Sequence, residues 1–283
     1  MESKRMALLT QAREKKFKIS KIRRFVLLAV IILFLLQFLK IKLLVGSMSA
    51  SLVVWAISLI DVFAYLESLL ASKSFTLSTF LAALPVVGIY LIFGRAFCGW
   101  VCPMDYLFEF VSKISSKRFS FSLDLPPWIG YFILLIFLII SLFIGIPIFT
   151  NYFSHLTNFF RALTGLVFAA LSLPFETSVI AYSLLMIIIL LVLEFFFPRL
   201  WCRVLCPVGK VYGLFNKVSL LSLKFKDGIC GECALCEDMC YMKVKILQNV
   251  DRKVLRDGNC IYCGRCVDGC EARGKIIEMK IGR

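Results

Sequence analysis

The chain has 283 residues, of which 60% are hydrophobic, and its mean hydropathy is +0.87. These values lie far outside the range of soluble proteins, so the composition indicates an integral membrane protein. The formal net charge of +15 comes from basic residues in the N-terminal segment, in short loops and in the tail. That distribution is typical of the cytoplasmic flanks of membrane helices, so we expect no nucleic-acid partner.

Residues 1–24 form a strongly basic segment ahead of an apolar run over residues 25–39 that continues towards Val45. This layout resembles a signal peptide, but the basic region is long and no small-residue cleavage pattern follows it. We therefore expect a retained signal anchor whose basic N-terminus lies in the cytoplasm.

Three further runs, residues 79–97, 129–149 and 179–197, are long enough to cross about 30 Å of hydrocarbon at about 1.5 Å per residue. With the first run they make four predicted spans, which places both termini in the cytoplasm of a multi-pass protein of the inner membrane. Residues 51–70 and 152–174 are also apolar but carry charges, and we expect interfacial or re-entrant helices there, on the outer side.

An internal repeat relates the two halves of residues 25–222 at an offset of 104 residues. The matching residues are Arg95, Phe97, Cys98, Cys102 and Pro103 in the first half and Arg199, Trp201, Cys202, Cys206 and Pro207 in the second. The repeat units, about 25–118 and 129–222, each predict a helical hairpin that ends in a C-x3-C-P motif. The fold class expected is a mainly α membrane protein with four transmembrane helices, both motifs lying on the cytoplasmic face.

The two motifs read RAFCGWVCP and RLWCRVLCP. A proline disfavours helix at the residue before it and suits the first position of a new helix, so each motif should mark a break between two helices. There, a helix N-terminus and neighbouring arginines are expected to lower the thiol pKa values. If the halves pack about a pseudo-twofold axis, four thiols converge on a candidate site for zinc, iron or a third cluster: Cys98, Cys102, Cys202 and Cys206. Inert buried cysteines or disulfides remain the alternative.

Residues 223–283 contain eight cysteines in two runs, each spaced C-x2-C-x2-C-x3-C. This spacing is the ligand pattern of bacterial ferredoxins with two 4Fe-4S clusters, in which the fourth cysteine of each run binds the other cluster. The expected ligands of the first cluster are Cys230, Cys233, Cys236 and Cys270, and those of the second are Cys260, Cys263, Cys266 and Cys240. A disulfide framework fits two equally spaced runs badly, and thiolate ligands imply a reducing, cytoplasmic compartment.

The tail should form a small α+β ferredoxin-like domain that is held together largely by its clusters. Residues 244–247 and 253–255 are expected to form short strands, with turn residues at Asp257, Gly258 and Asn259. Tyr241 and Glu271 stand where proline commonly follows the fourth cysteine, a change that affects the local turn and not the ligands.

The four spans, the paired C-x3-C-P motifs and the two-cluster tail, with its segment NCIYCGRCVDGC, together resemble the NapH and MauN type of membrane iron-sulfur protein. The resemblance is strongest to the quinol-dehydrogenase membrane subunit of periplasmic nitrate reductase systems. The motifs are shared with NosR-like and CcoG-like proteins, which carry additional domains. The resemblance implies an electron-transfer subunit that takes electrons from quinol in the membrane and works with a soluble iron-sulfur or cytochrome partner.

Two other functions stay open on the sequence. The first is a CcoG-like reductase or assembly factor that binds a soft ion such as copper with the membrane thiols and reduces it through the clusters. The second is a regulatory membrane protein that senses redox state.

Single polar residues within the apolar segments are less specific. His155 is the only histidine, so paired-histidine haem ligation within the chain is excluded, and we expect it to form an ordinary hydrogen bond or, alternatively, to accept a quinol proton. The acids Asp61, Glu67 and Glu194 either serve a function or reach an interface.

Overall fold

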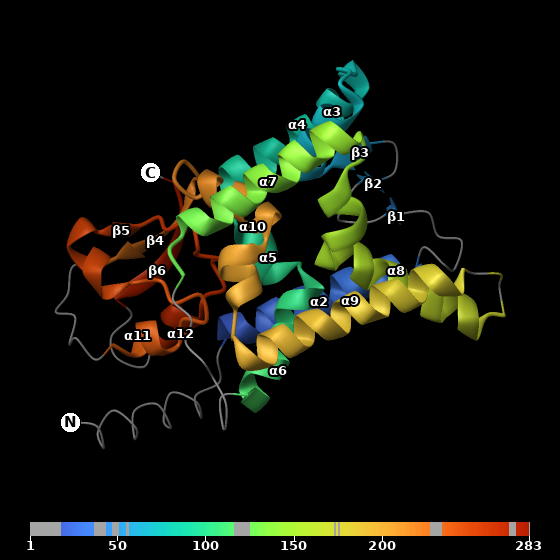
Figure 1. Cartoon of the computed structure of the whole chain (residues 1–283). Helices are drawn as coiled ribbons and strands as arrows, with labels where there is room; N and C mark the ends of the chain where they lie inside the picture. The colour runs from blue at the N-terminus through green and yellow to red at the C-terminus, as the bar shows by residue number, and fades with distance from the viewer. Residues whose placement is uncertain are drawn as a thin grey trace. The chain divides into compact units, whose positions relative to one another are not determined.

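The computed structural model describes residues 18–36, 44–46, 51–54, 57–115, 125–172, 174, 176–226, 234–271 and 276–282 (Figure 1). The chain divides into two compact units, each assembled from segments that are distant in sequence. Unit 1 comprises Met1–Val30, Ile89–Val101 and Tyr212–Arg283, and unit 2 comprises Ile31–Gly88 and Cys102–Val211. The first C-x3-C-P motif is thus divided between the units, with Cys98 in unit 1 and Cys102 in unit 2.

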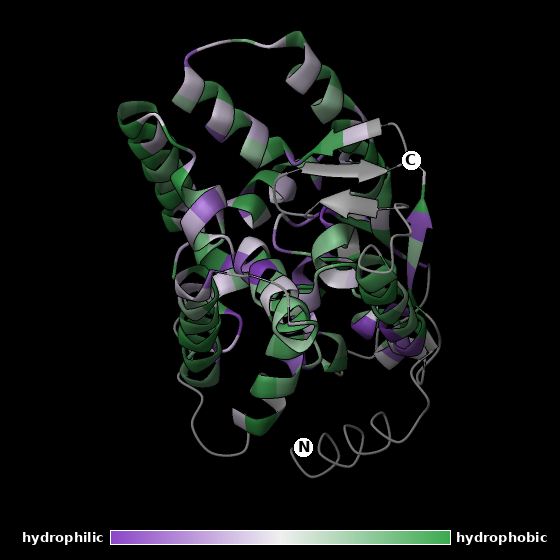
Figure 2. Ribbon diagram, turned by 90° about the vertical axis from the view of Figure 1, so that its right-hand side faces the viewer, coloured by the Kyte–Doolittle hydropathy of each residue, from purple (hydrophilic) through white to green (hydrophobic). Residues whose placement is uncertain are grey.

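The chain is mostly helical, and long helices lie at all four predicted spans: α2 (Lys18–Leu36), α4 (Leu77–Phe93), α7 (Trp128–Ile144) and α9 (Thr177–Phe196). Figure 2 shows the long helices coloured hydrophobic over most of their length. Among the described residues, α9 alone is long and apolar enough to cross a membrane, judged by length and composition, whereas α4 and α7 are shorter apolar helices. The helical nature of the spans is confirmed, and four crossings stay a proposal.

Two of these helices end earlier than the apolar runs that predicted them. The run over residues 79–97 continues past the end of α4, and the run over residues 129–149 continues past the end of α7. Gly94 and Gly145 follow the two helices with φ of 56° and 77°. A glycine in this left-handed conformation is a common helix terminator, because it has no Cβ to clash there. Hydropathy alone does not register that signal.

The prediction of a helix over residues 51–70 is wrong in its first half. Three strands, β1 (Leu44–Gly46), β2 (Ser51–Val54) and β3 (Ile57–Ile60), pair antiparallel in that order, and only then does α3 (Val62–Ser72) begin. Valine and isoleucine recur in these strands and favour pleated backbone. Asp61 caps α3, its Oδ2 accepting hydrogen bonds from the backbone N–H groups of Phe63 and Ala64.

Unit 2 is built from helices packed in pairs. Helix α3 packs against α7, and α8 (His155–Ala170) packs against α9 (Figure 1). Helix α6 (Pro103–Ser115), which follows the first C-x3-C-P motif, contacts both α8 and α9. The expected helix over residues 152–174 is therefore confirmed over the range of α8, with the π-helical turn η2 (Phe149–Phe153) in front of it.

Glu67 is completely buried in unit 2, and its carboxylate is fully used by the fold. It accepts hydrogen bonds from Ser141 Oγ at 2.8 Å and from the backbone nitrogens of Phe149 and Thr150 at 2.6 and 2.9 Å. These donors satisfy the charge and fix the start of η2. Glu67 therefore does not reach an interface, and its carboxylate has a structural role that neither sequence-based alternative included.

Unit 1 contains a second antiparallel sheet, with strand order β5-β4-β6: β4 (Leu221–Phe225), β5 (Val254–Leu255) and β6 (Ile277–Ile281). Two short helices carry part of the cysteine runs: α11 (Leu235–Asp238) and α12 (Arg265–Glu271). The strand expected at 253–255 is confirmed as β5. The one expected at 244–247 is wrong: the segment buries Val244 and Ile246 in an irregular conformation and continues into the 3-10 helix η4 (Leu247–Arg252).

Candidate iron-sulfur site

The second cysteine run wraps from a loop onto the start of a helix in unit 1. Cys260 and Cys263 lie in the loop, and Cys266 and Cys270 lie on α12. The loop follows the predicted turn, in which Cys260 N donates to Asp257 O at 3.0 Å. Tyr262 and Gly264 take left-handed φ values of 48° and 76°, which bend the loop sharply between successive cysteines.

Half of the first run lies within the described residues. Cys236 is on α11, and Cys240 follows that helix, with the backbone N–H of Val244 donating to its sulfur at 3.4 Å. Cys230 and Cys233 lie outside the described residues. None of the cysteines that the structure describes is held in a disulfide.

The thiols expected to bind the second cluster influence one another electrostatically. Burial raises the pKa of Cys266, and charge on Cys263, Cys260 and Cys240 raises it further. Burial likewise raises the pKa of Cys240 to about 11, with a further increase from charge on Cys263. Charge on Cys236, a ligand expected for the first cluster, raises the pKa of Cys266 as well, so the described cysteines of both runs lie in one region of unit 1. The donor set from both runs therefore fits a cluster that neutralises several thiolates at once.

Within the described ranges, no group of three or more His, Cys, Asp or Glu side chains is arranged to hold a single metal ion. This finding bears on mononuclear sites, in which four ligands surround one ion. In a 4Fe-4S cluster each cysteine binds a different iron atom, so the thiols stand farther apart.

Asn216 anchors the ligand loop. Its side chain is completely buried, and its Nδ2 donates to Asp257 O at 2.7 Å and to Cys260 O at 2.8 Å. Its Oδ1 accepts from the backbone N–H of Arg95 at 2.7 Å, and Arg95 Nη1 donates to Gly258 O at 3.1 Å. One amide thus ties the loop before Cys260 to the segment that carries Cys98.

The segment around Cys98 packs directly on the ligand loop. This segment is the short helix α5 (Ala96–Trp100). Trp100 Nε1 donates to Tyr262 O at 2.8 Å. A Cβ atom added to Gly99 would lie 2.5 Å from Ile261 O, so only glycine allows this close approach. These contacts could not be predicted from the sequence, since Asn216, Gly99 and Trp100 match no ligand or capping pattern.

In both C-x3-C-P motifs a new helix begins at the proline, as the sequence predicts. Helix α6 begins at Pro103, and α10 (Pro207–Phe215) begins at Pro207. Cys202 lies in a π-helical turn, η3 (Trp201–Leu205), an irregularity often found at functional sites. Cys206 closes that turn in an extended conformation, and its sulfur accepts from the backbone N–H of Gly209 at 3.4 Å.

The structure brings together only part of the four-thiol site. Cys202 and Cys206 are coupled, since charge on Cys206 raises the pKa of Cys202. The expected lowering of thiol pKa by arginine is not found at Cys202: desolvation raises its pKa, and the nearby Arg199 offsets only part of that rise. Convergence of all four cysteines stays a prediction.

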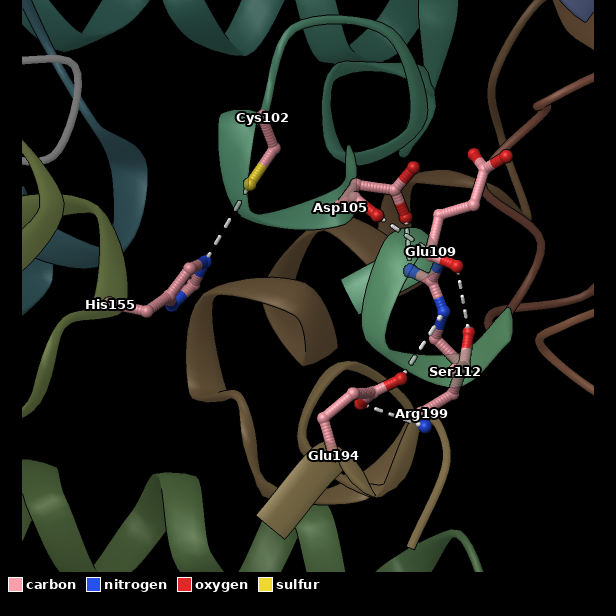
Figure 3. Close-up of polar contacts among 7 residues, drawn as sticks. All are labelled: Cys102, Asp105, Glu109, Ser112, His155, Glu194 and Arg199. Atoms are coloured by element: carbon pink, nitrogen blue, oxygen red, sulfur yellow. Dashed lines mark hydrogen bonds and ion pairs between the residues drawn. The ribbon is translucent and has the colours of Figure 1, made fainter. Parts of the chain in front are cut away.

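Arg199 is held in a buried ionic network of unit 2 (Figure 3). Its Nη1 forms an ion pair with Asp105 on α6, and its backbone N–H donates to Glu194 Oε2 at 2.9 Å. Glu194, near the end of α9, also lies 3.7 Å from Arg199 Nε. The network therefore joins the helix after the first motif to the residues before the second, and it gives Glu194 a structural partner.

His155 contacts a cysteine, which the sequence did not predict. The contact contradicts the expectation that residues 152–174 lie on the outer side while both C-x3-C-P motifs lie on the cytoplasmic face. Its Nε2 lies 3.8 Å from Cys102 Sγ, as Figure 3 shows, and its Nδ1 lies 3.2 Å from Trp201 Nε1. Burial lowers the pKa of His155 to about 4, so the ring is neutral at pH 7. The indole N–H satisfies one ring nitrogen, and the other faces the sulfur.

Two segments of the chain, residues 75–122 and 179–226, match the family model described as a 4Fe-4S binding domain. They lie at the same offset of 104 residues as the two C-x3-C-P motifs. Each matched segment contains one motif and ends before the cysteine runs of the tail. The cysteines within the matched segments are Cys98, Cys102, Cys202 and Cys206.

The chain is similar to an uncharacterized protein and to proteins named as ferredoxin-type. The chain is 31% identical over 180 residues to the uncharacterized protein MJ0750 of Methanocaldococcus jannaschii, a match covering 59% of this chain and 67% of that protein. It is 26% identical over 222 residues to the methylamine utilization ferredoxin-type protein MauN of Methylobacillus flagellatus, covering 77% and 74%. It is 28% identical over 198 residues to the ferredoxin-type protein NapH of Haemophilus influenzae, covering 69% of this chain and 64%, less than two thirds, of that protein. No solved structure matches the chain.

Proposed function

Because the chain belongs to the NapH/MauN type of iron-sulfur proteins, we propose that it is an electron-transfer subunit linking the membrane quinone pool to partner redox proteins. Two 4Fe-4S clusters in the tail would carry the electrons. The family resemblance favours quinol oxidation as the direction. A soluble iron-sulfur or cytochrome partner would complete the path.

The residues that would hold the clusters come from both cysteine runs. The first set is Cys230, Cys233, Cys236 and Cys270, and the second is Cys260, Cys263, Cys266 and Cys240. When bound, each cluster supplies a centre that accepts and donates one electron. The chain's own contribution is to bury the thiols, bend the loop at Tyr262 and Gly264, and fix the loop carbonyls with Asn216 and Trp100.

The observation that carries this proposal is the contact between the first C-x3-C-P segment and the ligand loop of the second cluster. Trp100 donates to Tyr262 O, and Gly99 lies against Ile261, between two ligand cysteines. Cys98 is the residue next to Gly99. A redox group held at Cys98 would therefore stand beside the second cluster, which is the arrangement needed to pass electrons between the spans and the tail.

Residues of α7 and α9 support a membrane location for the spans. Large apolar side chains project from both helices with at least half of their surface exposed: Phe132, Leu135, Phe143, Leu185, Ile188, Ile189 and Val192. Such continuous apolar exposure suits contact with lipid and is uncommon on soluble monomers.

A contact in unit 1 supports the cytoplasmic location of the clusters. Asp268, on α12 between Cys266 and Cys270, accepts hydrogen bonds from the backbone nitrogens of Ile19 and Ser20, both at 3.2 Å. Those nitrogens belong to the first turn of α2, within the basic N-terminal segment. Because basic flanks of membrane helices favour the cytoplasm, the cluster helix would lie on that side too.

The four cysteines of the two motifs would form a third thiolate centre. The family model described as 4Fe-4S binding covers both motifs and includes no other cysteine. A pair of thiols from each repeat supplies the number of ligands that an iron-sulfur cluster or a single soft ion needs. Loss of iron from the purified chain on Cys202→Ser, with both tail clusters retained, would support this centre.

A reductive titration tests the proposal. Purified chain with its clusters loaded is mixed with menaquinol, and the clusters are followed by electron paramagnetic resonance. We expect signals of reduced clusters to grow with added quinol. If no quinone or quinol changes the cluster signals, even with the partner subunit present, the proposal is wrong. Quinone-independent reduction of cupric ion that is lost on Cys98→Ser and Cys202→Ser would instead indicate the metal-reductase alternative.

A further inference from the structure

The chain's only histidine lies in unit 2, where it contacts the second cysteine of the first C-x3-C-P motif and a residue beside the first cysteine of the second motif. His155 comes from the first residue of α8, outside both motifs. Its Nε2 faces the second cysteine of the first motif, Cys102, and its Nδ1 faces Trp201, the residue directly before Cys202. Only 5% of the His155 surface and 7% of the Cys102 surface are exposed, so water does not compete for these contacts.

The indole of Trp201 determines which ring nitrogen carries the proton. An indole N–H can only donate, so His155 Nδ1, at 3.2 Å from Trp201 Nε1, must accept and carries no proton. A protonated imidazolium, with donors at both nitrogens, is incompatible with this contact. The neutral ring therefore has its proton on Nε2, and that N–H faces Cys102 Sγ at 3.8 Å, within the range for a sulfur acceptor.

We propose that His155 is a positioning residue, held by Trp201 in its Nε2–H tautomer so that it donates a hydrogen bond to the sulfur of Cys102. The arrangement couples the second motif to a ligand of the first. Its part in electron transfer rests on the proposed function, but the hydrogen bond itself does not.

The charge of the acceptor sulfur determines how strong this hydrogen bond is. A thiol sulfur is a weak acceptor, whereas an anionic sulfur is a strong one, and hydrogen bonds to cysteine sulfur also adjust the potential of an iron-sulfur centre. A buried donor fixed in direction is suited to a thiolate ligand more than to an inert thiol. The pair thus favours a ligand role for Cys102 over that of a small buried hydrophobe.

Because His155 is the only histidine, isotope labelling gives a single-site experiment. The full chain is produced with 15N-labelled histidine and an affinity tag that lacks histidine, and its ring nitrogens are recorded by NMR in the oxidised state. We expect one neutral ring, with a proton on Nε2 and none on Nδ1. A ring that is protonated on Nδ1, doubly protonated, or exchanging between tautomers would overturn the proposal without any variant being made.

Two substitutions then identify the partners. Trp201→Phe removes the indole donor, so we expect the Nδ1 resonance to shift and the tautomers to begin exchanging. Trp128→Phe is the matched control, because Trp128 is exposed on α7, and it should leave the ring unchanged. Cys102→Ala should shift the Nε2 proton and spare Nδ1; an unchanged Nε2 proton would contradict the bond to sulfur. None of these readouts involves quinol, so a failure here is distinct from failure of the electron-transfer proposal.

Discussion

Asn216 shows how much of the site depends on one side chain that is neither a ligand nor charged. Its amide makes three hydrogen bonds to backbone groups, two of them to carbonyls of the loop that leads into Cys260. Because the residue has no exposed surface, each group it bonds would lack water as a substitute partner.

We therefore expect Asn216→Ala to destabilise unit 1 by about 2 to 4 kcal/mol, since several buried polar groups lose their partner. The second cluster should be lost first on heating, which visible absorbance of the purified protein measures. Asn249→Ala is a matched control: its amide donates to Lys245 O at an exposed position, so the expected change is within about 0.5 kcal/mol. Equal cluster loss in the two variants would contradict the anchoring role.

The raised thiol pKa values predict how cluster loading depends on pH. Burial raises the pKa of Cys240 to about 11 and also raises those of Cys260 and Cys266. These thiols are protonated at neutral pH before iron binds, and each must lose its proton to become a ligand. Loading should therefore strengthen as pH rises towards these pKa values, by up to about tenfold per pH unit for each proton released.

In vitro reconstitution with iron and sulfide measures this dependence. The yield of the second cluster at limiting iron should increase from about pH 7 to about pH 9, because more of each ligand is deprotonated. A yield that stays level or falls over this range would argue against buried, protonated ligands.

At the residue scale, the sequence shows which cysteines are candidate ligands, but it does not show which residues hold the ligand loop in place. The spacing of the two runs is a local pattern with a known chemical use, so the sequence predicts two ligand sets, and these sets stay a prediction. Asn216, Gly99 and the pairing of His155 with Cys102 depend on which distant segments meet in the fold. Arg199 looked like an activator of thiols, yet its guanidinium pairs with Asp105, and desolvation decides the pKa of Cys202.

At the scale of elements, the backbone of helix α5 packs directly against the backbone of the ligand loop. Gly99→Ala tests it, because the added Cβ would meet Ile261 O at 2.5 Å and must displace one backbone from the other. We expect an altered paramagnetic spectrum of the second cluster. Gly88→Ala is the control: its added Cβ meets no atom within 4 Å, and alanine suits a helix better than glycine. Identical spectra in all three proteins would show that the contact does not shape the cluster.

The contact of Asp268 with α2 makes a second prediction at this scale. Removing the carboxylate with Asp268→Ala takes away the acceptor for two backbone N–H groups in the first turn of α2, at a cost of about 1 kcal/mol. Hydrogen exchange of Ile19 and Ser20 should become faster by roughly fivefold, a factor set by that energy. Unchanged exchange would mean that other groups cap this helix.

A helix or strand boundary can be predicted from the sequence when a residue at that boundary determines it. Pro103 and Pro207 start helices because the proline ring sets φ and needs no backbone donor, and both starts were predictable. The ends of α4 and α7 were predicted too late, since the apolar run outlasts the glycine that terminates the helix. The β1-β2-β3 sheet was missed because short apolar strands and apolar helices have similar composition.

At the scale of the whole molecule, one continuous chain would connect lipid, thiols and clusters. The N-terminal end of α2, the segment after α4 and the residues after α10 all contribute contacts to the cluster-bearing part of unit 1. The first two of these segments adjoin predicted spans, and the third follows the second C-x3-C-P motif. The membrane helices would thus provide the support on which the ligand loop is held, which explains why a tail with little core of its own needs them.

The central claim is that electrons enter the second cluster through the segment that carries Cys98. The most direct test mixes menaquinol rapidly with the cluster-loaded chain in lipid vesicles and measures the rate at which the second cluster is reduced, in the native protein, in Gly99→Ala and in Gly88→Ala. We predict that quinol reduces the cluster in the native chain and in Gly88→Ala at the same rate, and that Gly99→Ala, with both clusters still present, is slower. Equal rates in all three proteins would contradict this route, and no reduction of the native chain would contradict quinol as the source.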